Sequence, residues 1–317
     1  MMLAWILFIF LSALILAMDV LIPQTAAGTN AFNRAAVLCS LPVFLALVYG
    51  LYLHFALAQS VGAPAVAGPH PALTFSTGYL LELGLSADNV MMFIIMLRAL
   101  KIPAADQSLV MFWAIILAIV ARVVLILTGL ALIGRFHLLF YFMGAFLVLA
   151  GGLMFFQPDG ERGIGERLIG LSSNILPISP EYAGRQMVVL INGRRRITPL
   201  LLAIILVGLV DVLFAFDSIP AVFGITSDPL IVTSSNVFAV LALHRLYFIM
   251  APLMDRLRFL EAGLAVILLF IGGKMLLPLL AAYVPAVQIS TTTSLLVILA
   301  VLLSAAGASF AFPAKKK

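Results

Sequence analysis

The sequence predicts an all-α polytopic membrane protein with about nine transmembrane helices, six of which form an inverted repeat of three-helix units. Of the 317 residues, 64% are hydrophobic and only 10% are charged, whereas about 25% of residues are charged in soluble domains. Apolar runs of about 20 residues, which is long enough to cross a bilayer, recur along the chain. In addition, two similar acidic segments occur in the two halves of the sequence.

The apolar runs divide the chain into five expected parts. These are two peripheral helices in 1–72, the first three-helix repeat in 73–157, a cytoplasmic polar loop in 158–197, the second repeat in 198–282, and a last helix with a basic tail in 283–317. The first run lacks a basic leading segment and a cleavage site, so it is interpreted as a permanent span. The expected spans are 1–22, 35–59, 73–100, 107–134, 137–157, 198–226, 232–254, 259–282 and 291–312.

The basic residues indicate an orientation. In a nine-span arrangement, 14 of the 18 Lys and Arg residues lie on one side, and only Arg135 lies on the other. The positive-inside rule therefore predicts that the amino terminus is outside and the carboxyl terminus is cytoplasmic. The expected location is a bacterial inner membrane, and the net charge of +5 is attributed to orientation rather than to nucleic-acid binding.

The acidic segments carry the internal repeat. Glu82 and Asp88 are followed by Asn89, while Asp211 and Asp217 are followed by Ser218, and each acid of the second segment lies 129 residues after its counterpart. Each following helix contains an arginine, and each unit closes with a glycine pair. These residues are Arg122, Arg245, Gly151, Gly152, Gly272 and Gly273. Because a unit has three spans, successive units would cross the membrane in opposite directions, with the site at their interface.

The spacing of the two acids in each segment constrains their geometry. On a continuous α-helix, six residues correspond to a turn of about 600°, which leaves the two acids about 120° apart. Two arrangements satisfy this spacing. Either the helices break between the acids, with Gly84 and Pro220 as plausible breakers, or the two acids of each helix face different cavities.

The polar residues of the two segments are oxygen donors. The predicted metal ligands are Glu82, Asp88, Asn89, Asp211, Asp217 and Ser218, and neither segment contains Cys or His. Such ligands favour Mn²⁺, Mg²⁺ or Ca²⁺. Without a cation, four clustered carboxylates could not all stay ionised, and some would bind protons. This predicts proton-coupled cation transport, with the divalent cation as substrate and no resident cofactor.

An alternative is that the acids form buried ion pairs with Arg122 and Arg245, since charges inside membranes also pair with one another. Because acids outnumber arginines, we expect a cation site in which the arginines support the ligands or link helices. Asn236 is expected to be a helix cap or a pore-lining amide. Asp19 is predicted to lie at the membrane interface, and His54 and His70 are isolated in the sequence.

At these residues the chain resembles the TerC family of integral membrane proteins, including its Alx-like members. The resemblance rests on GYLLELGLSADNVMMF at 78–93, on the segment from Asp211 to Leu241, on LYF at 246–248 and on GLAVILLFIGGKML at 263–276. The resemblance implies a multi-span protein that is linked by name to tellurite resistance. It also implies Mn²⁺ export, which is the activity of the better understood members. His244 and Arg245 depart from the basic position of many relatives.

The leading hypothesis is a transporter that exports divalent cations, with Mn²⁺ first, through a carboxylate site at the membrane midplane. The alternative is a non-transporting factor for membrane-protein assembly or metal delivery, which the resemblance also implies. An exporter of organic solutes is disfavoured, because such a pocket would be largely apolar. An enzyme is not expected, since no nucleophile with a positioned base and no phosphate-binding glycine loop occurs.

Overall fold

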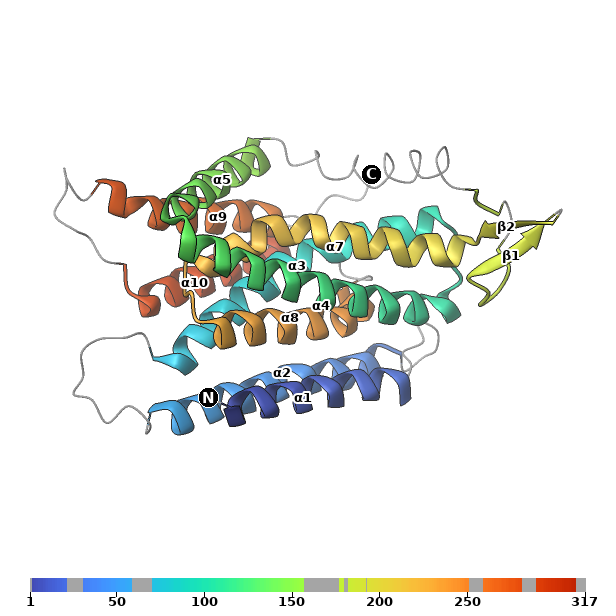
Figure 1. Cartoon of the computed structure of the whole chain (residues 1–317), viewed down its shortest axis with the longest axis horizontal. Coiled ribbons are helices and arrows are strands. Elements are labelled where there is room, and N and C mark those ends of the chain that lie inside the picture. The colour runs from blue at the N-terminus through green and yellow to red at the C-terminus, as the bar shows by residue number, and fades with distance from the viewer. Residues whose placement is uncertain are drawn as a thin grey trace.

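The computed structural model describes residues 2–21, 31–58, 70–156, 177–179, 182–191, 193–250, 259–280 and 289–311. Within these ranges the chain forms nine α-helices and one two-stranded sheet (Figure 1). Each helix lies within a few residues of an apolar run of the sequence. The helices are α1 (Met2–Leu21), α2 (Ala31–Ala58), α3 (Pro71–Ala99), α4 (Ala104–Arg135), α5 (His137–Phe156), α7 (Pro199–Phe223), α8 (Pro229–Met250), α9 (Leu260–Leu280) and α10 (Thr291–Ala311).

The helices identify an integral membrane protein. By length and composition, α1, α4, α5, α7, α9 and α10 could each cross a bilayer, and shorter apolar stretches lie in α2 at Ser40–Ala56 and in α8 at Pro229–Leu243. Outward-facing side chains of α2 such as Phe44 and Leu47 are about 60% exposed, as expected of surfaces that contact lipid. The six helices confirm a polytopic membrane protein, while the nine spans and the division into repeats stay predictions.

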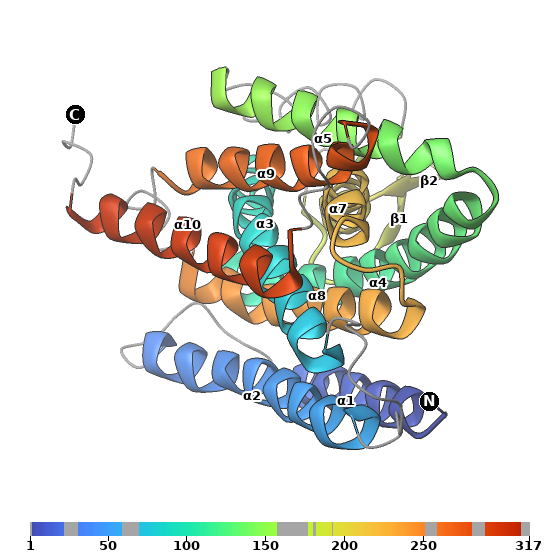
Figure 2. The ribbon, with the colours of Figure 1, turned by 90° about the vertical axis from the view of Figure 1, so that its left-hand side faces the viewer.

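The bundle has three layers, which are visible in Figure 2. The outer layers are α5 with α9 on one side and α1 with α2 on the other, and the central layer contains α3, α4, α7 and α8. α10 packs against α9 and α3. In the central layer, α3 packs on α8 and α4 packs on α7, so each helix lies beside a partner from the other half of the chain.

Glycines bring α5 and α9 into direct backbone contact. A Cβ atom added to Gly272 would lie 2.7 Å from the carbonyl oxygen of Gly144, and one added to Gly151 would lie 2.8 Å from that of Ala265. By contrast, Gly152 and Gly273 have nothing within 4 Å of the added atom. Small residues allow such close approach in membranes. Only the first glycine of each pair therefore supports the close packing of the two helices.

The polar segment contains a β-hairpin that the sequence analysis did not predict. Strands β1 (Val188–Ile191) and β2 (Arg194–Ile197) pair in antiparallel fashion, and Gly193 adopts a φ of +73°, which glycine tolerates. The available signal was the Asn-Gly pair that follows the β-prone run Val188–Ile191, since this dipeptide favours tight hairpin turns. The hairpin lies at the end of the molecule where α4 and α7 begin (Figure 1).

Two contacts fix the hairpin segment to the bundle. The Thr198 side chain accepts a hydrogen bond from the Leu201 backbone N–H at 3.3 Å and caps the start of α7. Asp106, in the first turn of α4, accepts hydrogen bonds from the Tyr182 hydroxyl at 2.7 Å and from Arg185 Nε at 2.8 Å. The Asp106 hydrogen bond and burial both raise the pKa of Tyr182, burial being the larger cause.

Candidate functional site

The two acidic helices are continuous. α3 extends through Gly84, where an added Cβ would meet the Leu302 side chain of α10 at 3.0 Å, so this glycine serves helix packing. Pro220 lies inside α7 only three residues before the helix ends at Phe223, where a missing backbone donor disturbs little of the helix. The predicted helix breaks are therefore absent. The other predicted arrangement therefore remains, in which the two acids of each continuous helix face different surroundings.

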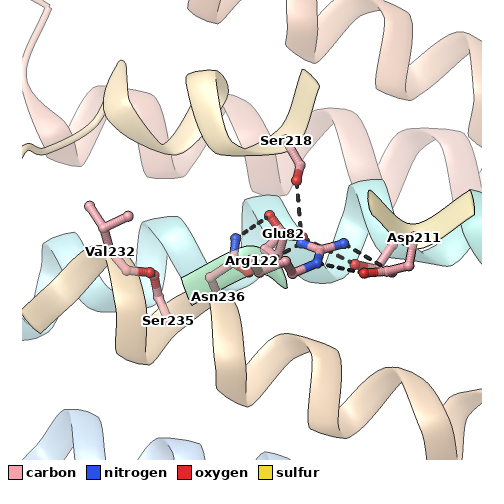
Figure 3. A network of polar contacts seen from close by, with 8 residues as sticks. Glu82, Arg122, Asp211, Ser218, Val232, Ser235 and Asn236 are labelled. Atoms are coloured by element: carbon pink, nitrogen blue, oxygen red, sulfur yellow. Dashed lines mark hydrogen bonds and ion pairs between the residues drawn. The ribbon is translucent and has the colours of Figure 1, made fainter. Parts of the chain in front are cut away.

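Arg122 of α4 is the centre of a buried charge network (Figure 3). Its side chain is fully buried and forms ion pairs with Glu82 of α3 and Asp211 of α7. Nε donates to Asp211 Oδ2 at 2.8 Å, Nη2 donates to Asp211 Oδ1 at 3.1 Å, and Nη1 donates to Glu82 Oε1. The two parallel bonds to Asp211 are the strong, directional form of an arginine–carboxylate pair.

Neutral side chains complete the network. Arg122 Nη1 lies 3.3 Å from Ser218 Oγ and 3.2 Å from Asn236 Oδ1. The Asn236 amide nitrogen donates to Glu82 Oε2 at 3.0 Å, and Ser86 Oγ donates to Glu82 Oε1 at 3.4 Å. The network thus joins α3, α4, α7 and α8. Asn236 is not a helix cap, because it lies within α8, where its amide links the arginine to an acid; its role as a pore-lining amide stays a prediction.

The charges of this network do not cancel. With both carboxylates ionised, Glu82 and Asp211 carry two negative charges and Arg122 carries one positive charge, which leaves a formal charge of −1. All three side chains are almost completely inaccessible to solvent. Removing one member of a buried ion pair costs about 3–5 kcal/mol, because the remaining charge is left uncompensated. One negative charge of the network is therefore not balanced by Arg122.

A second polar group lies next to this network. Asn89, Asp217 and Ser218 line a small cavity of about 10 Å³ together with apolar side chains that include Leu85 and Phe214. That volume admits about one water-sized particle, and a bare divalent ion is smaller. Since α7 is continuous, the 120° rotation between its acids directs Asp217 into this cavity and Asp211 towards Arg122. Ser218 belongs to both groups.

The structure thus separates the predicted ligands. Glu82 and Asp211 bind Arg122, whereas Asn89, Asp217 and Ser218 surround the cavity, and the side chain of Asp88 lies outside the described residues. Across the ranges that the structure describes, no three His, Cys, Asp or Glu side chains are placed to hold one metal ion. The expected single cluster of four carboxylates is therefore not formed there, because Arg122 occupies the space between two of them.

The second arginine has a different partner from the one expected. Arg245 of α8 lies 2.5 Å from Asp19 of α1 in a buried ion pair. The Asp19 side chain is 2% exposed, so it is enclosed by neighbouring helices, and its position at the membrane interface stays a prediction. An acid and an arginine that both lie within apolar runs are expected to pair, and this was the available signal. The pair attaches α1 to the central layer and is separate from the Arg122 network.

Two histidines that are distant in sequence also meet. The rings of His54, near the end of α2, and His70, at the start of α3, stack with centroids 4.7 Å apart and planes inclined by 20°. The two residues, which are isolated in the sequence, are therefore neighbours in the structure. His244, which precedes Arg245 in the sequence, has a side chain outside the described residues.

A bundle of apolar helices that encloses charged side chains defines an integral membrane protein with a polar site in its interior. The sequence profile of the Integral membrane protein TerC family matches residues 67–317. The chain belongs to this family, which confirms the resemblance seen in its motifs.

Several relatives share most of their length with this chain. The uncharacterized membrane protein STKORF319 of Myxococcus xanthus is 38% identical over 293 residues, which cover 92% of this chain and 89% of the relative. The candidate membrane-bound redox modulator Alx of Escherichia coli is 40% identical over 278 residues, covering 87% of this chain and 86% of Alx. The uncharacterized membrane protein MT2795 of Mycobacterium tuberculosis is 35% identical, covering 97% and 79% respectively. No solved structure matches the chain.

Proposed function

We propose that this protein is a transporter that exports divalent metal cations, with Mn²⁺ as the leading substrate. The observation that carries the proposal is the cavity lined by Asn89, Asp217 and Ser218 beside a buried network with a formal charge of −1. Hard oxygen ligands favour Mn²⁺, Mg²⁺ and Ca²⁺ over softer ions. A carboxylate in the interior of a membrane protein is expensive and is by default an element of function.

The packing of the central layer supports an inverted repeat. If α3, α4 and α5 correspond to α7, α8 and α9, then the contact of α3 with α8 corresponds to that of α7 with α4. The contact of α5 with α9 corresponds to itself under the same exchange. α3 and α7 also run in opposite directions (Figure 1). This arrangement is the plan of transporters whose substrate site lies at the repeat interface near the midplane.

The direction of the helices supports nine spans with a cytoplasmic carboxyl terminus. Successive helices alternate in direction, and the arginine-bearing strand β2 lies at the end where α3 finishes and α4 and α7 begin (Figure 1). That end also includes Arg98 and Lys101, which flank the end of α3. By the positive-inside rule this is the cytoplasmic end in a bacterial inner membrane, so export would proceed towards the opposite end.

Proton coupling is part of the proposal. When a divalent cation leaves, the acids beside the cavity lose a counter-charge, and proton uptake is the least costly way to restore it. We propose that protons entering from outside replace the departing cation. Transport by purified protein in vesicles should therefore change the luminal pH in step with cation movement.

The test is Asp217→Asn with Asp106→Asn as a matched control. Asp106 is also an acid in a helix but contacts Tyr182 and the exposed Arg185 rather than the cavity. In inside-out membrane vesicles, Asp217→Asn should slow Mn²⁺ uptake by about tenfold or more, because cation affinity depends on the charge of the ligands, and Asp106→Asn should leave it unchanged. Equal rates in wild type and Asp217→Asn at equal protein levels would refute the cation site.

The alternative function is a non-transporting factor for membrane-protein assembly or metal delivery, and it predicts that Asp217→Asn is tolerated. Cellular Mn, Fe, Mg, Ca and Zn contents with and without the protein separate the two functions, since the alternative predicts no direct change in flux. The name of Alx suggests redox modulation. This chain has a single cysteine, Cys39, so a dithiol–disulfide couple within one chain is not available to it.

A further inference from the structure

We infer that Arg122 is a tethered cation that competes with the transported ion for Glu82 and Asp211, and that this competition selects divalent cations. The inference rests on the proposed function and concerns what the site does when no metal is bound. In the described structure the guanidinium engages both acids at once. A cation can use these acids only if Arg122 releases at least one of them.

The geometry supports release at low cost, because Arg122 has alternative acceptors within reach. Nη1 carries two protons but lies near three acceptors, namely Glu82 Oε1, Ser218 Oγ and Asn236 Oδ1. Its hydrogen bonds are therefore shared among more acceptors than it can satisfy. If a cation takes Glu82, Nη1 keeps the serine and the amide without moving out of the network.

Ser218 links the arginine to the cavity. Its hydroxyl lies 3.3 Å from Arg122 Nη1, and the same residue lines the cavity with Asp217 and Asn89. A cation in the cavity would draw the Ser218 oxygen towards itself and repel the adjacent guanidinium. Arrival of the ion and departure of Arg122 from Glu82 are thus coupled through one side chain, which accounts for the sharing of Ser218 by both polar groups.

The competition has a consequence for selectivity. A monovalent ion that displaces the guanidinium replaces one positive charge by another and gains little in Coulomb energy. A divalent ion adds a second charge to a buried network with a net charge of −1, where electrostatic interactions are stronger than in water. Arg122 would therefore exclude Na⁺ and K⁺ from the acids while leaving them open to divalent cations.

The experiment compares Arg122→Gln and Arg122→Lys with the control Arg185→Gln. Arg185 also pairs with an aspartate, Asp106, but its side chain is 71% exposed. Mn²⁺ affinity is measured on purified full-length protein by titration with Mn²⁺ detected by electron paramagnetic resonance. Arg122→Gln should bind Mn²⁺ at least about tenfold more tightly than wild type, which is equivalent to about 1.4 kcal/mol. It should also transport Mn²⁺ more slowly, because the bound ion is not released. Arg185→Gln should match wild type, and Arg122→Lys should be intermediate, since lysine cannot hold a carboxylate through two bonds.

The thermal unfolding midpoint, measured with and without millimolar MnCl₂, keeps the test decisive if Arg122→Gln is unstable. A tethered cation predicts that Mn²⁺ stabilises Arg122→Gln more than wild type, because the metal replaces the missing charge. It also predicts that millimolar Na⁺ and K⁺ compete with Mn²⁺ in Arg122→Gln but not in wild type. If wild type transports Mn²⁺ while Arg122→Gln binds it no more tightly and is not preferentially stabilised, Arg122 is only a structural ion pair and the inference fails. If wild type itself neither binds nor transports divalent cations, the proposed function fails instead.

Discussion

The contact between α5 and α9 provides a stringent test of the packing, because adjacent glycines in α9 have opposite surroundings. We compare Gly272→Ala with Gly273→Ala. A Cβ at position 272 would lie 2.7 Å from the Gly144 carbonyl oxygen and 2.8 Å from the Val148 backbone nitrogen, whereas position 273 has nothing within 4 Å. The two substitutions add the same methyl group to the same helix and differ only in what it meets.

The magnitude follows from this geometry. An ordinary contact begins at about 3.4 Å, so the methyl group at position 272 requires the helices to separate by about 0.7 Å. The nearest atoms belong to backbone and cannot rotate away. Overpacking of this kind costs about 1–3 kcal/mol, while replacing glycine by alanine in a helix stabilises it by up to about 1 kcal/mol. We therefore expect Gly273→Ala to be neutral or stabilising and Gly272→Ala to be less stable than Gly273→Ala by about 1–3 kcal/mol.

The assay is the thermal unfolding midpoint of each variant in the same detergent and at the same heating rate, read from the fraction that stays monodisperse on size-exclusion chromatography. Gly272→Ala should unfold at a temperature lower than Gly273→Ala by about 2 °C or more for each kcal/mol. The pair Gly151→Ala and Gly152→Ala repeats the comparison on α5, where only position 151 contacts the partner backbone, at 2.8 Å. Equal midpoints within each pair would show that the two helices do not approach as described.

Two further outcomes follow from contacts outside the site. Asp19→Asn or Arg245→Gln alone should destabilise the protein by about 3–5 kcal/mol, because each leaves a buried charge unpaired. The double variant Asp19→Leu with Arg245→Met should recover most of this loss when unfolding is measured in detergent. A double variant as unstable as the sum of the two single variants would argue against the ion pair. Thr198→Ala should cost about 0.5–2 kcal/mol through loss of the helix cap, whereas Thr198→Ser should retain it, and equal midpoints for the two variants would exclude a capping role.

Much of the fold follows from the hydrophobic pattern. The apolar runs predicted the positions of the helices to within a few residues, because a membrane requires about 20 apolar residues per span and satisfies backbone groups only within the helix. The same pattern could not distinguish Gly272 from Gly273, since both lie in one apolar run. The hairpin of β1 and β2 was missed because its Asn-Gly turn lies in a segment of mixed polarity that resembles a loop.

The candidate site was predicted in composition but not in arrangement. The sequence already identified the polar side chains within apolar runs, where they are too costly to be incidental. These are the duplicated acids and, in addition, Asn89, Ser218, Arg122 and Asn236. Which of them meet depends on the rotation of α3 and α7 about their axes and on the crossing of α4 between them. The sequence fixes neither quantity, so the expected cluster of four carboxylates gave way to an arginine-centred network.

The sequence by itself therefore determined that this is a TerC family membrane protein, where its helices lie and which residues bring polarity into its interior. Only the tertiary structure decided that Arg122 binds both Glu82 and Asp211, that Asp217 faces a separate cavity, and that Asp19 is paired with Arg245. The physical reason is that helix formation and membrane insertion depend on local composition. Charge pairing in the bundle depends instead on which helix faces are brought together from distant parts of the chain.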